Sequence, residues 1–206
     1  MKKQVIFVDP LEKRFFRKGA GLPDNNIGCS AEGKLAGELE KYGISTEVIR
    51  MFNHVVEEAS EKVEKLDPKV VAFSVLTLSF WRVKELAEDI KGRLPEVKIV
   101  LGGYHMNTVP EDIIKSEAFD YAVLGYGEIP FRRLVQRLLA GDRNVDDIAG
   151  LVIRDPLVPG GFRRTAKQVL PAVENFTWAK RDWETIRESR CEGLFYPPPS
   201  QQGELK

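Results

Sequence analysis

Cysteine and histidine are scarce in this chain, with two residues of each among 206. The cysteines, Cys29 and Cys191, and the histidines, His54 and His105, are widely separated in the sequence. Four isolated side chains do not provide the close spacing that holds structural zinc or an iron–sulfur cluster. A disulfide is disfavoured as well, because two distant cysteines do not resemble the framework of a small exported domain. The composition therefore fits a reducing, cytoplasmic setting.

The chain also lacks net charge and long apolar runs. Its 31 basic residues balance 31 acidic ones, so nothing in the composition favours nucleic acid or an anionic membrane as a partner. No apolar run approaches the roughly 18 residues that a membrane-spanning helix needs. The start, 1–9, is too short for a signal peptide and instead resembles a first strand. With 43% hydrophobic residues, the chain can bury the core of one ordinary domain and an appendage.

Short apolar runs alternate with helical patterns over the first 140 residues. We expect strands at 5–8, 46–49, 70–75, 97–101 and 119–124, and helices at 35–42, 54–66, 81–94 and 129–139, with a short helix opened by 110–112. The run at 70–75 is the most apolar, as a central strand covered on both faces should be. This alternation predicts a right-handed, doubly wound parallel sheet of the α/β class.

The pattern changes after Gly150 and divides the chain into three parts. Residues 1–149 are expected to form the α/β domain. Residues 150–190 are expected to form a β-hairpin, with strands at 151–154 and 162–165 around a turn rich in proline and glycine, followed by a partly helical, linker-like extension. Residues 191–206 are expected to be a flexible, proline-rich tail.

Small and polar residues follow three of the predicted strands. Ser74 and Thr77 follow the central strand, Gly102-Gly103 follows the next, and Gly125-Tyr126-Gly127-Glu128 follows the fifth. The carboxyl ends of parallel strands share one edge of a sheet, and ligands of open α/β sheets bind outside that edge. Each motif has a simpler reading: the diglycine turns the chain, the hydroxyls make local turn bonds, and Glu128 supports a helix N-terminus.

Taken together, the three segments resemble a known family. The runs 71–77, 99–105 and 120–128 are similar to the cobalamin-binding domain found ahead of the radical S-adenosylmethionine (SAM) domain in cobalamin-dependent radical enzymes. That family typically carries Ser-x-x-Thr, Gly-Gly-x-His and Gly-Glu-Gly-Glu at these places, and Tyr126 departs from the third motif. The resemblance extends over about residues 1–185, because the hairpin and the stretch around Asp182-Trp183 resemble the linker into the radical domain.

The resemblance implies a flavodoxin-like (Rossmann-like) five-stranded fold, with cobalamin across the carboxyl ends of the strands and its nucleotide tail inserted beside the sheet. The tail would lie in a narrow slot that glycine backbone can line. The implied partners are the corrinoid itself and a radical SAM protein or domain. The residues predicted to bind the cofactor are Ser74, Leu76, Thr77, Gly102, Gly103, Tyr104, His105, Gly125, Tyr126, Gly127 and Glu128.

Two departures from related families limit the prediction. Cobalamin domains of methionine synthase and the mutases carry Asp-x-His-x-x-Gly after the first strand, whereas Asp9-Pro10-Leu11-Glu12-Lys13 contains no histidine. We therefore expect no cobalt ligand from this loop, and expect His105 to act as a hydrogen-bonding residue and His54 as a surface residue. The radical domain's Cys-x-x-x-Cys-x-x-Cys motif is also missing, so this chain is expected to hold no iron–sulfur cluster and to generate no radical by itself.

Other functions remain open at this stage. The same fold could serve as an interaction or regulatory module that has lost its cofactor. A receiver domain is a weaker alternative, because Ser74 and Gly125 stand where its phosphorylated Asp and its Lys belong. A dinucleotide or flavin site is disfavoured, because no Gly-x-Gly-x-x-Gly follows the first strand. The sequence shows no arrangement of serine, histidine and carboxylate that indicates catalysis by this chain alone.

Overall fold

The computed structural model describes residues 3–10, 31–50 and 55–169, and the structural statements below concern these residues. The elements in chain order are β1 (Val5–Asp9), α1 (Ala31–Glu40), β2 (Thr46–Arg50), α2 (Val56–Leu66), β3 (Val70–Ser74), η3 (Thr77–Ser79), α3 (Phe80–Arg93), β4 (Lys98–Gly102), α4 (Tyr104–Thr108), η4 (Pro110–Lys115), β5 (Tyr121–Val123), α5 (Glu128–Leu139), β6 (Leu151–Arg154) and β7 (Phe162–Arg164). Here η marks a 3₁₀ helix.

The strands form one seven-stranded sheet in the order β2-β1-β3-β4-β5-β6-β7. The first five strands are parallel, and their order is the flavodoxin-like one. The predicted α/β fold is therefore confirmed. The predicted hairpin also forms, and it extends the sheet: β6 pairs antiparallel with β5, and β7 pairs antiparallel with β6.

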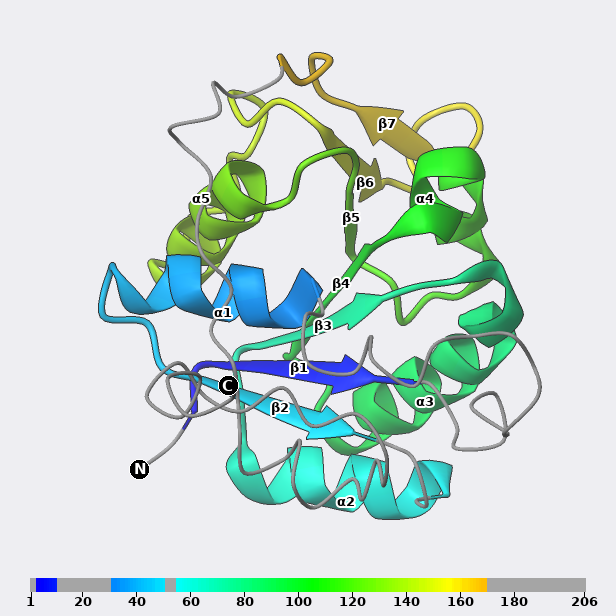
Figure 1. The fold of residues 1–206 in the computed structure, drawn as a ribbon. Helices are drawn as coiled ribbons and strands as arrows, with labels where there is room; N and C mark the ends of the chain where they lie inside the picture. The colour runs from blue at the N-terminus through cyan, green and yellow to red at the C-terminus, as the bar shows by residue number, and fades with distance from the viewer. Residues whose placement is uncertain (1–2, 11–30, 51–54, 170–206) are drawn as a thin grey trace, which may run out of the picture.

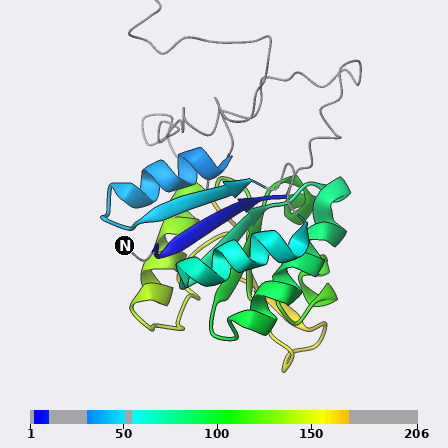
Figure 2. The ribbon, with the colours of Figure 1, turned by 90° about the horizontal axis from the view of Figure 1, so that it is seen from below.

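Helices cover the sheet on both faces (Figure 1). Helices α1 and α5 pack on one face, called here the α1/α5 face, and α2 and α3 pack on the other, the α2/α3 face. Seen from below, α2 lies in front of the strands (Figure 2). Successive residues of a strand point to opposite faces, so each strand contributes to two separate cores. In β3, Val71 and Phe73 pack on the α2/α3 face, whereas Val70 and Ala72 pack on the α1/α5 face.

Most expected elements form within a few residues of their predicted bounds, but the region around α1 differs. The helix begins at Ala31 and ends at Glu40, which leaves Tyr42 in the turn that Gly43 closes with a φ of 72°. The segment before Leu35 has no large apolar side chain, so hydrophobic spacing could not indicate the helix start. The short helix α4 was not expected, since it covers only five residues. The predicted helical extension, the proline-rich tail, His54, Cys29 and Cys191 lie outside the described residues.

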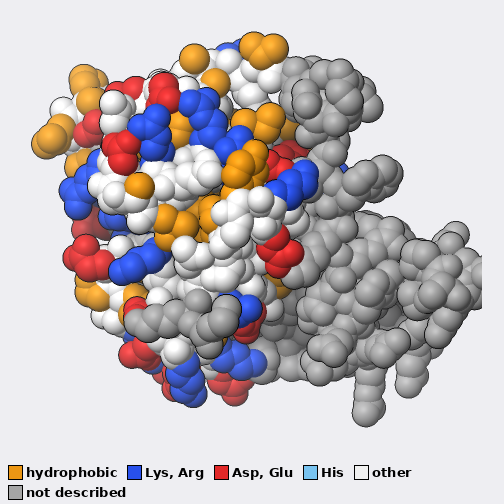
Figure 3. Space-filling model, turned by 90° about the vertical axis from the view of Figure 1, so that its left-hand side faces the viewer, with side chains coloured by type: hydrophobic (Ala, Val, Ile, Leu, Met, Phe, Trp, Pro, Cys, Tyr) orange, Lys and Arg blue, Asp and Glu red, His pale blue; other side chains and the backbone are white. Residues whose placement is uncertain are grey.

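The surface of the described part carries charges of both signs. On the face shown in Figure 3, Lys and Arg side chains lie interspersed with Asp and Glu side chains. None of the helices in 3–10, 31–50 and 55–169 is both long enough and apolar enough to cross a membrane.

Candidate functional site

A cavity of about 490 Å³ opens at the edge of the sheet where the parallel strands end, called here the carboxyl edge. Strands β1, β3, β4 and β5 contribute to it, together with the starts of α1, α4 and α5. Its size lies within the range of about 300–1,000 Å³ that is usual for small-molecule pockets. The residues that line it are Phe7, Ala31, Glu32, Lys34, Leu35, Ala72, Phe73, Ser74, Val100, Leu101, Gly102, Gly103, Tyr104, Asn107, Val123, Gly125, Tyr126, Gly127, Glu128 and Phe131.

The interior of the cavity is apolar and lies on the α1/α5 face. Its floor consists of side chains of that face from neighbouring strands, among them Ala72 and Val100, which are nearly fully buried. Phe131 of α5 also lines the cavity and contacts Phe7, with 5.6 Å between the two ring centroids. Ala72 is smaller than its neighbours along the floor. The cavity between the sheet and the two helices therefore suits a largely apolar group.

Polar groups gather at the helix starts. Glu32 and Glu128 lie in the first turns of α1 and α5, where the helix dipole favours a carboxylate, and both are at least nine-tenths buried. Lys34 is exposed at the same cavity. Carboxylates accept hydrogen bonds, so this wall suits amide or hydroxyl donors of a ligand. Burial, with help from the Asp120 carboxylate, raises the pKa of Tyr121, whose side chain lies outside the cavity lining.

Gly102, the last residue of β4, and Gly103, which follows it, have different environments. Gly102 pairs with Ser74 in the sheet register and lines the cavity, and a Cβ there would make only ordinary contacts, at 3.7 Å or more. Gly103 has a φ of 88°, and a Cβ there would lie 2.7 Å from the backbone nitrogen of Val75. His105 N–H donates to the Val75 carbonyl, which closes this turn against β3. Gly103 is therefore required by the approach of two backbone segments.

Three of the predicted site residues lie outside the cavity lining. Leu76 caps the short helix η3, where its N–H donates to Ser79 Oγ at 3.2 Å. His105 is buried against the Phe80 ring, with 4.4 Å between ring centroids. Its Nδ1 lies 3.3 Å from Thr77 Oγ1 and its Nε2 lies 3.1 Å from Asp112 Oδ2. Both ring nitrogens thus have hydrogen-bonding partners on the α2/α3 face, and Thr77 itself is exposed at the carboxyl edge.

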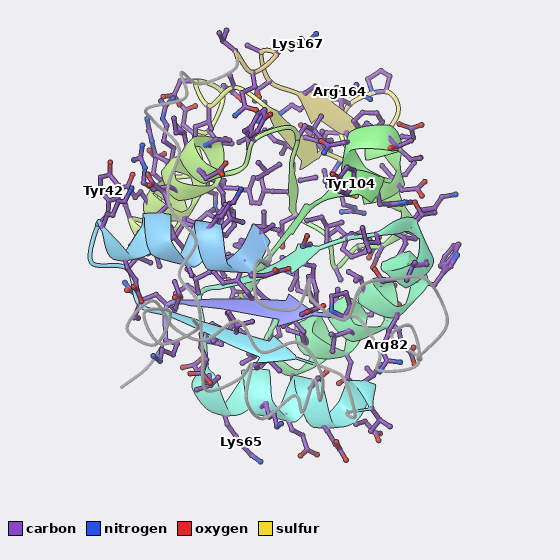
Figure 4. The ribbon with its side chains drawn as sticks, viewed as in Figure 1. Tyr42, Lys65, Arg82, Tyr104, Arg164 and Lys167 are labelled. Atoms are coloured by element: carbon purple, nitrogen blue, oxygen red, sulfur yellow. The ribbon has the colours of Figure 1, made fainter. Side chains whose placement is uncertain are left out.

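The other eight predicted residues do come together at the cavity: Ser74, Gly102, Gly103, Tyr104, Gly125, Tyr126, Gly127 and Glu128. The side chain of Tyr104, labelled in Figure 4 next to the end of β4, is 79% exposed. Sequence reasoning missed the apolar floor and the contribution of α1. The available signal was the alternation of the strands, which places Phe7, Ala72 and Val100 on one face, but that signal cannot distinguish a cavity wall from a packed core.

Among the described residues, no group of three or more His, Cys, Asp or Glu side chains is placed to hold a metal ion. The residues that face the cavity are suited to an organic group, which they can surround with apolar side chains, glycine backbone and a few hydrogen-bonding groups.

Comparison with known proteins identifies the class of this domain. Residues 34–135 match the family model described as the B12 binding domain. That segment runs from α1 to α5 and includes all three motifs at the carboxyl edge. The recognition made from those motifs is confirmed: the chain contains a B12-binding domain homologous to those of cobalamin-dependent radical SAM methyltransferases.

Two curated relatives and one solved structure illustrate the similarity. A 2-(S-pantetheinyl)-carbapenam-3-carboxylate methyltransferase of Streptantibioticus cattleyicolor is 33% identical over 97 residues, which is 46% of this chain and 14% of that protein. The cobalamin-dependent radical SAM methyltransferase TokK of Streptomyces tokunonensis is 29% identical over 90 residues, 43% of this chain and 13% of that protein. The chain therefore spans a small part of the length of these relatives.

The fold similarity extends further along the chain. The structure of the radical S-adenosylmethionine methyltransferase TsrM from Kitasatospora setae, with cobalamin and a [4Fe-4S] cluster bound, superimposes with a TM-score of 0.64. The superposition covers 87% of this chain and 31% of the TsrM chain, at 21% sequence identity. At that identity the likeness establishes the fold alone.

Proposed function

We propose that this domain binds cobalamin, with the nucleotide tail in the cavity on the α1/α5 face and the corrin ring across the carboxyl edge. The observation that carries the proposal is the coincidence of the cavity with the three motifs: eight of the eleven residues predicted from sequence line it. The family match and the cobalamin-bound relatives support the same ligand.

Different residues are assigned to different parts of the cofactor. Ala72, Val100 and Phe131 give the tail an apolar slot, and Gly102 keeps its entrance free of side chains. Glu128 and Ser74 can bond to amide or hydroxyl groups of the cofactor. Thr77 is exposed beside the cavity, and we assign it to the corrin side chains. Leu76 and His105 act indirectly, by fixing η3 and the Thr77 hydroxyl.

When bound, cobalamin supplies the cobalt centre that takes part in methyl transfer or radical chemistry. The protein's own part is to hold the corrinoid and present its exposed face. We propose that the chemistry is carried out with a radical SAM domain, by analogy with the relatives in which the two domains occur together. The sequence has no histidine at 9–13, so we propose that no residue of this loop ligates the cobalt.

Titration with hydroxocobalamin tests the proposal. The visible spectrum should shift on binding, and the cofactor should co-elute with the protein in gel filtration at tens of micromolar. Cobinamide, which lacks the nucleotide tail, should bind at least about tenfold more weakly if the tail fills the cavity. If neither a spectral shift nor co-elution is observed, the proposal is wrong, and the alternative of an interaction or regulatory module that has lost its cofactor is favoured.

A further inference from the structure

The segment after β7 lies against the loop that joins β5 to α5, which forms one side of the cavity. Pairing between β6 and β7 continues beyond the strands themselves: Thr165 N–H donates to the Leu151 carbonyl at 3.0 Å, and Gly150 N–H donates to the Ala166 carbonyl at 2.8 Å. Gly150 in turn accepts a 2.8 Å hydrogen bond from Leu124 N–H at the end of β5. Two residues further on, Gln168 reaches the loop itself.

The amide of Gln168 pairs with both backbone groups of Tyr126. Gln168 Oε1 accepts from Tyr126 N–H at 2.9 Å, and Gln168 Nε2 donates to the Tyr126 carbonyl at 2.5 Å. The preceding N–H, that of Gly125, donates to Asn107 Oδ1 of α4 at 2.7 Å. The loop is thus held between two amide side chains, one from α4 and one from the segment that follows β7. Backbone groups in a loop without regular pairing depend on such partners for a fixed conformation.

Two glycines make room for the Gln168 side chain. A Cβ on Gly125 would lie 2.5 Å from Gln168 Oε1, and a Cβ on Gly150 would lie 3.4 Å from Gln168 Cβ. Both glycines have positive φ values, of 73° and 86°. The first glycine of the Gly-Tyr-Gly-Glu motif is therefore needed for the contact with Gln168 and for its own backbone conformation. The presence of glycine at position 125 is therefore explained by contacts within the protein, without a ligand.

We propose that Gln168 is a positioning residue of the corrinoid site. It holds Gly125 and Tyr126 in the conformation that forms the cavity wall, although Gln168 itself is not among the residues that line the cavity. The site therefore includes a residue more than thirty positions beyond the matched segment 34–135. This inference deepens the proposed function and depends on it for the identity of the ligand, but the hydrogen bonds on which it rests are independent of any ligand.

Variants of the full chain test this role. Gln168→Ala removes both hydrogen bonds, and Gln168→Glu keeps the acceptor for Tyr126 N–H but loses the donor. Lys167→Ala is the matched control, because Lys167 is an exposed neighbour that lies at the outer edge of the molecule in Figure 4. Hydrogen exchange of the Tyr126 amide, measured by NMR without ligand, should accelerate at least about tenfold in Gln168→Ala and stay unchanged in Lys167→Ala. The amide of Val100, in the sheet centre, should be unaffected in both.

The same variants are then titrated with hydroxocobalamin. Gln168→Ala should raise the Kd about tenfold, as expected from the loss of two partly exposed hydrogen bonds. Gln168→Glu should bind no more tightly than Gln168→Ala, because a carboxylate oxygen would replace the Nε2 donor and face the Tyr126 carbonyl. Lys167→Ala should stay within about twofold of the wild type. An effect through global unfolding would instead accelerate exchange at Val100 as well.

The outcomes separate the two proposals. If wild-type protein binds hydroxocobalamin and Gln168→Ala binds it equally well, the positioning role is overturned and the proposed function stands. Unchanged exchange at Tyr126 in Gln168→Ala also overturns the positioning role, because the loop would then not depend on this side chain. If the wild type shows no binding at tens of micromolar, the proposed function fails, and the role of Gln168 in a corrinoid site fails with it.

Discussion

On the α1/α5 face the strand ends leave a cavity of about 490 Å³, whereas on the α2/α3 face the same strands end beneath packed side chains. Ser74 and Gly102 line the cavity, whereas Val75, the residue after Ser74, is fully buried and bonds through its backbone to Gly102 and His105. Two neighbours in one motif thus belong to different layers. Ligand binding and scaffold construction are divided between alternate residues, as the pleat of a strand requires.

The Ser-x-x-Thr and Gly-Gly-x-His motifs illustrate this division. Ser74 and Gly102 are placed for a ligand, whereas His105 links Thr77 to Asp112 and packs on Phe80. The histidine of the second motif is therefore explained by its contacts within the protein. Substitutions on the two sides should separate into those that affect binding and those that affect stability.

The largest effect is expected for Gly103→Ala, at the point where the backbone after β4 meets the backbone after β3. Its φ of 88° and ψ of −175° are almost exclusive to glycine, and the new Cβ would meet backbone atoms of Val75 at 2.7 and 2.8 Å. We expect a loss of about 3 kcal/mol or more in the free energy of unfolding, measured by urea denaturation. Gly43→Ala is the control: its φ is 72° but no atom lies within 4 Å of the new Cβ, so a loss of about 1–2 kcal/mol is expected. Equal losses in the two variants would contradict the backbone contact.

The next effect is expected on the ligand side, for Gly102→Leu. A side chain at this position projects toward the cavity without a close backbone contact. Hydroxocobalamin affinity should fall about hundredfold, equivalent to about 2.7 kcal/mol, because the slot is filled. The free energy of unfolding should change by less than about 1 kcal/mol. A variant that binds as tightly as the wild type would show that the ligand does not use this cavity.

An intermediate effect on stability is expected for His105→Ala. The change removes hydrogen bonds to Thr77 and Asp112 and the contact with the Phe80 ring, and should cost about 2 kcal/mol by thermal or urea unfolding. Corrinoid affinity should fall by less than about threefold, since the ring does not line the cavity. A loss of affinity much larger than this, with stability unchanged, would instead place His105 among the direct ligands.

The smallest effect, and a stabilising one, is expected for Gly92→Ala. This residue lies near the end of α3, and a Cβ there would meet no atom within 4 Å. Alanine should raise the free energy of unfolding by about 0.5–1 kcal/mol, through its higher helix propensity, and should leave hydroxocobalamin affinity unchanged. Destabilisation would show that the helix is packed more tightly at this point than the structure indicates.

The sequence predicted the central sheet well, because buried parallel strands give continuous apolar runs such as that of β3. It also indicated eight residues around the cavity, since strand ends of a parallel sheet meet at one edge. It could not indicate the floor of the cavity, because Ala72 and Val100 have the same pattern whether they face a ligand or a helix. Gln168 was also missed: its contact with Tyr126 joins residues 42 apart, and no local pattern records such a pairing.

The β6–β7 hairpin has a consequence for the route of the chain. Helix α5 begins at the carboxyl edge and runs away from it, and β6 starts again at that edge, with Leu151 opposite Val123. Strand β6 runs away from the carboxyl edge, and the antiparallel strand β7 runs back to it. There Thr165 N–H donates to the Leu151 carbonyl. The backbone therefore passes Val169 beside the mouth of the cavity rather than at the opposite end of the sheet. The described part of the chain therefore ends on the same side of the sheet as the proposed corrinoid, with Gln168 in contact with the loop that lines the cavity.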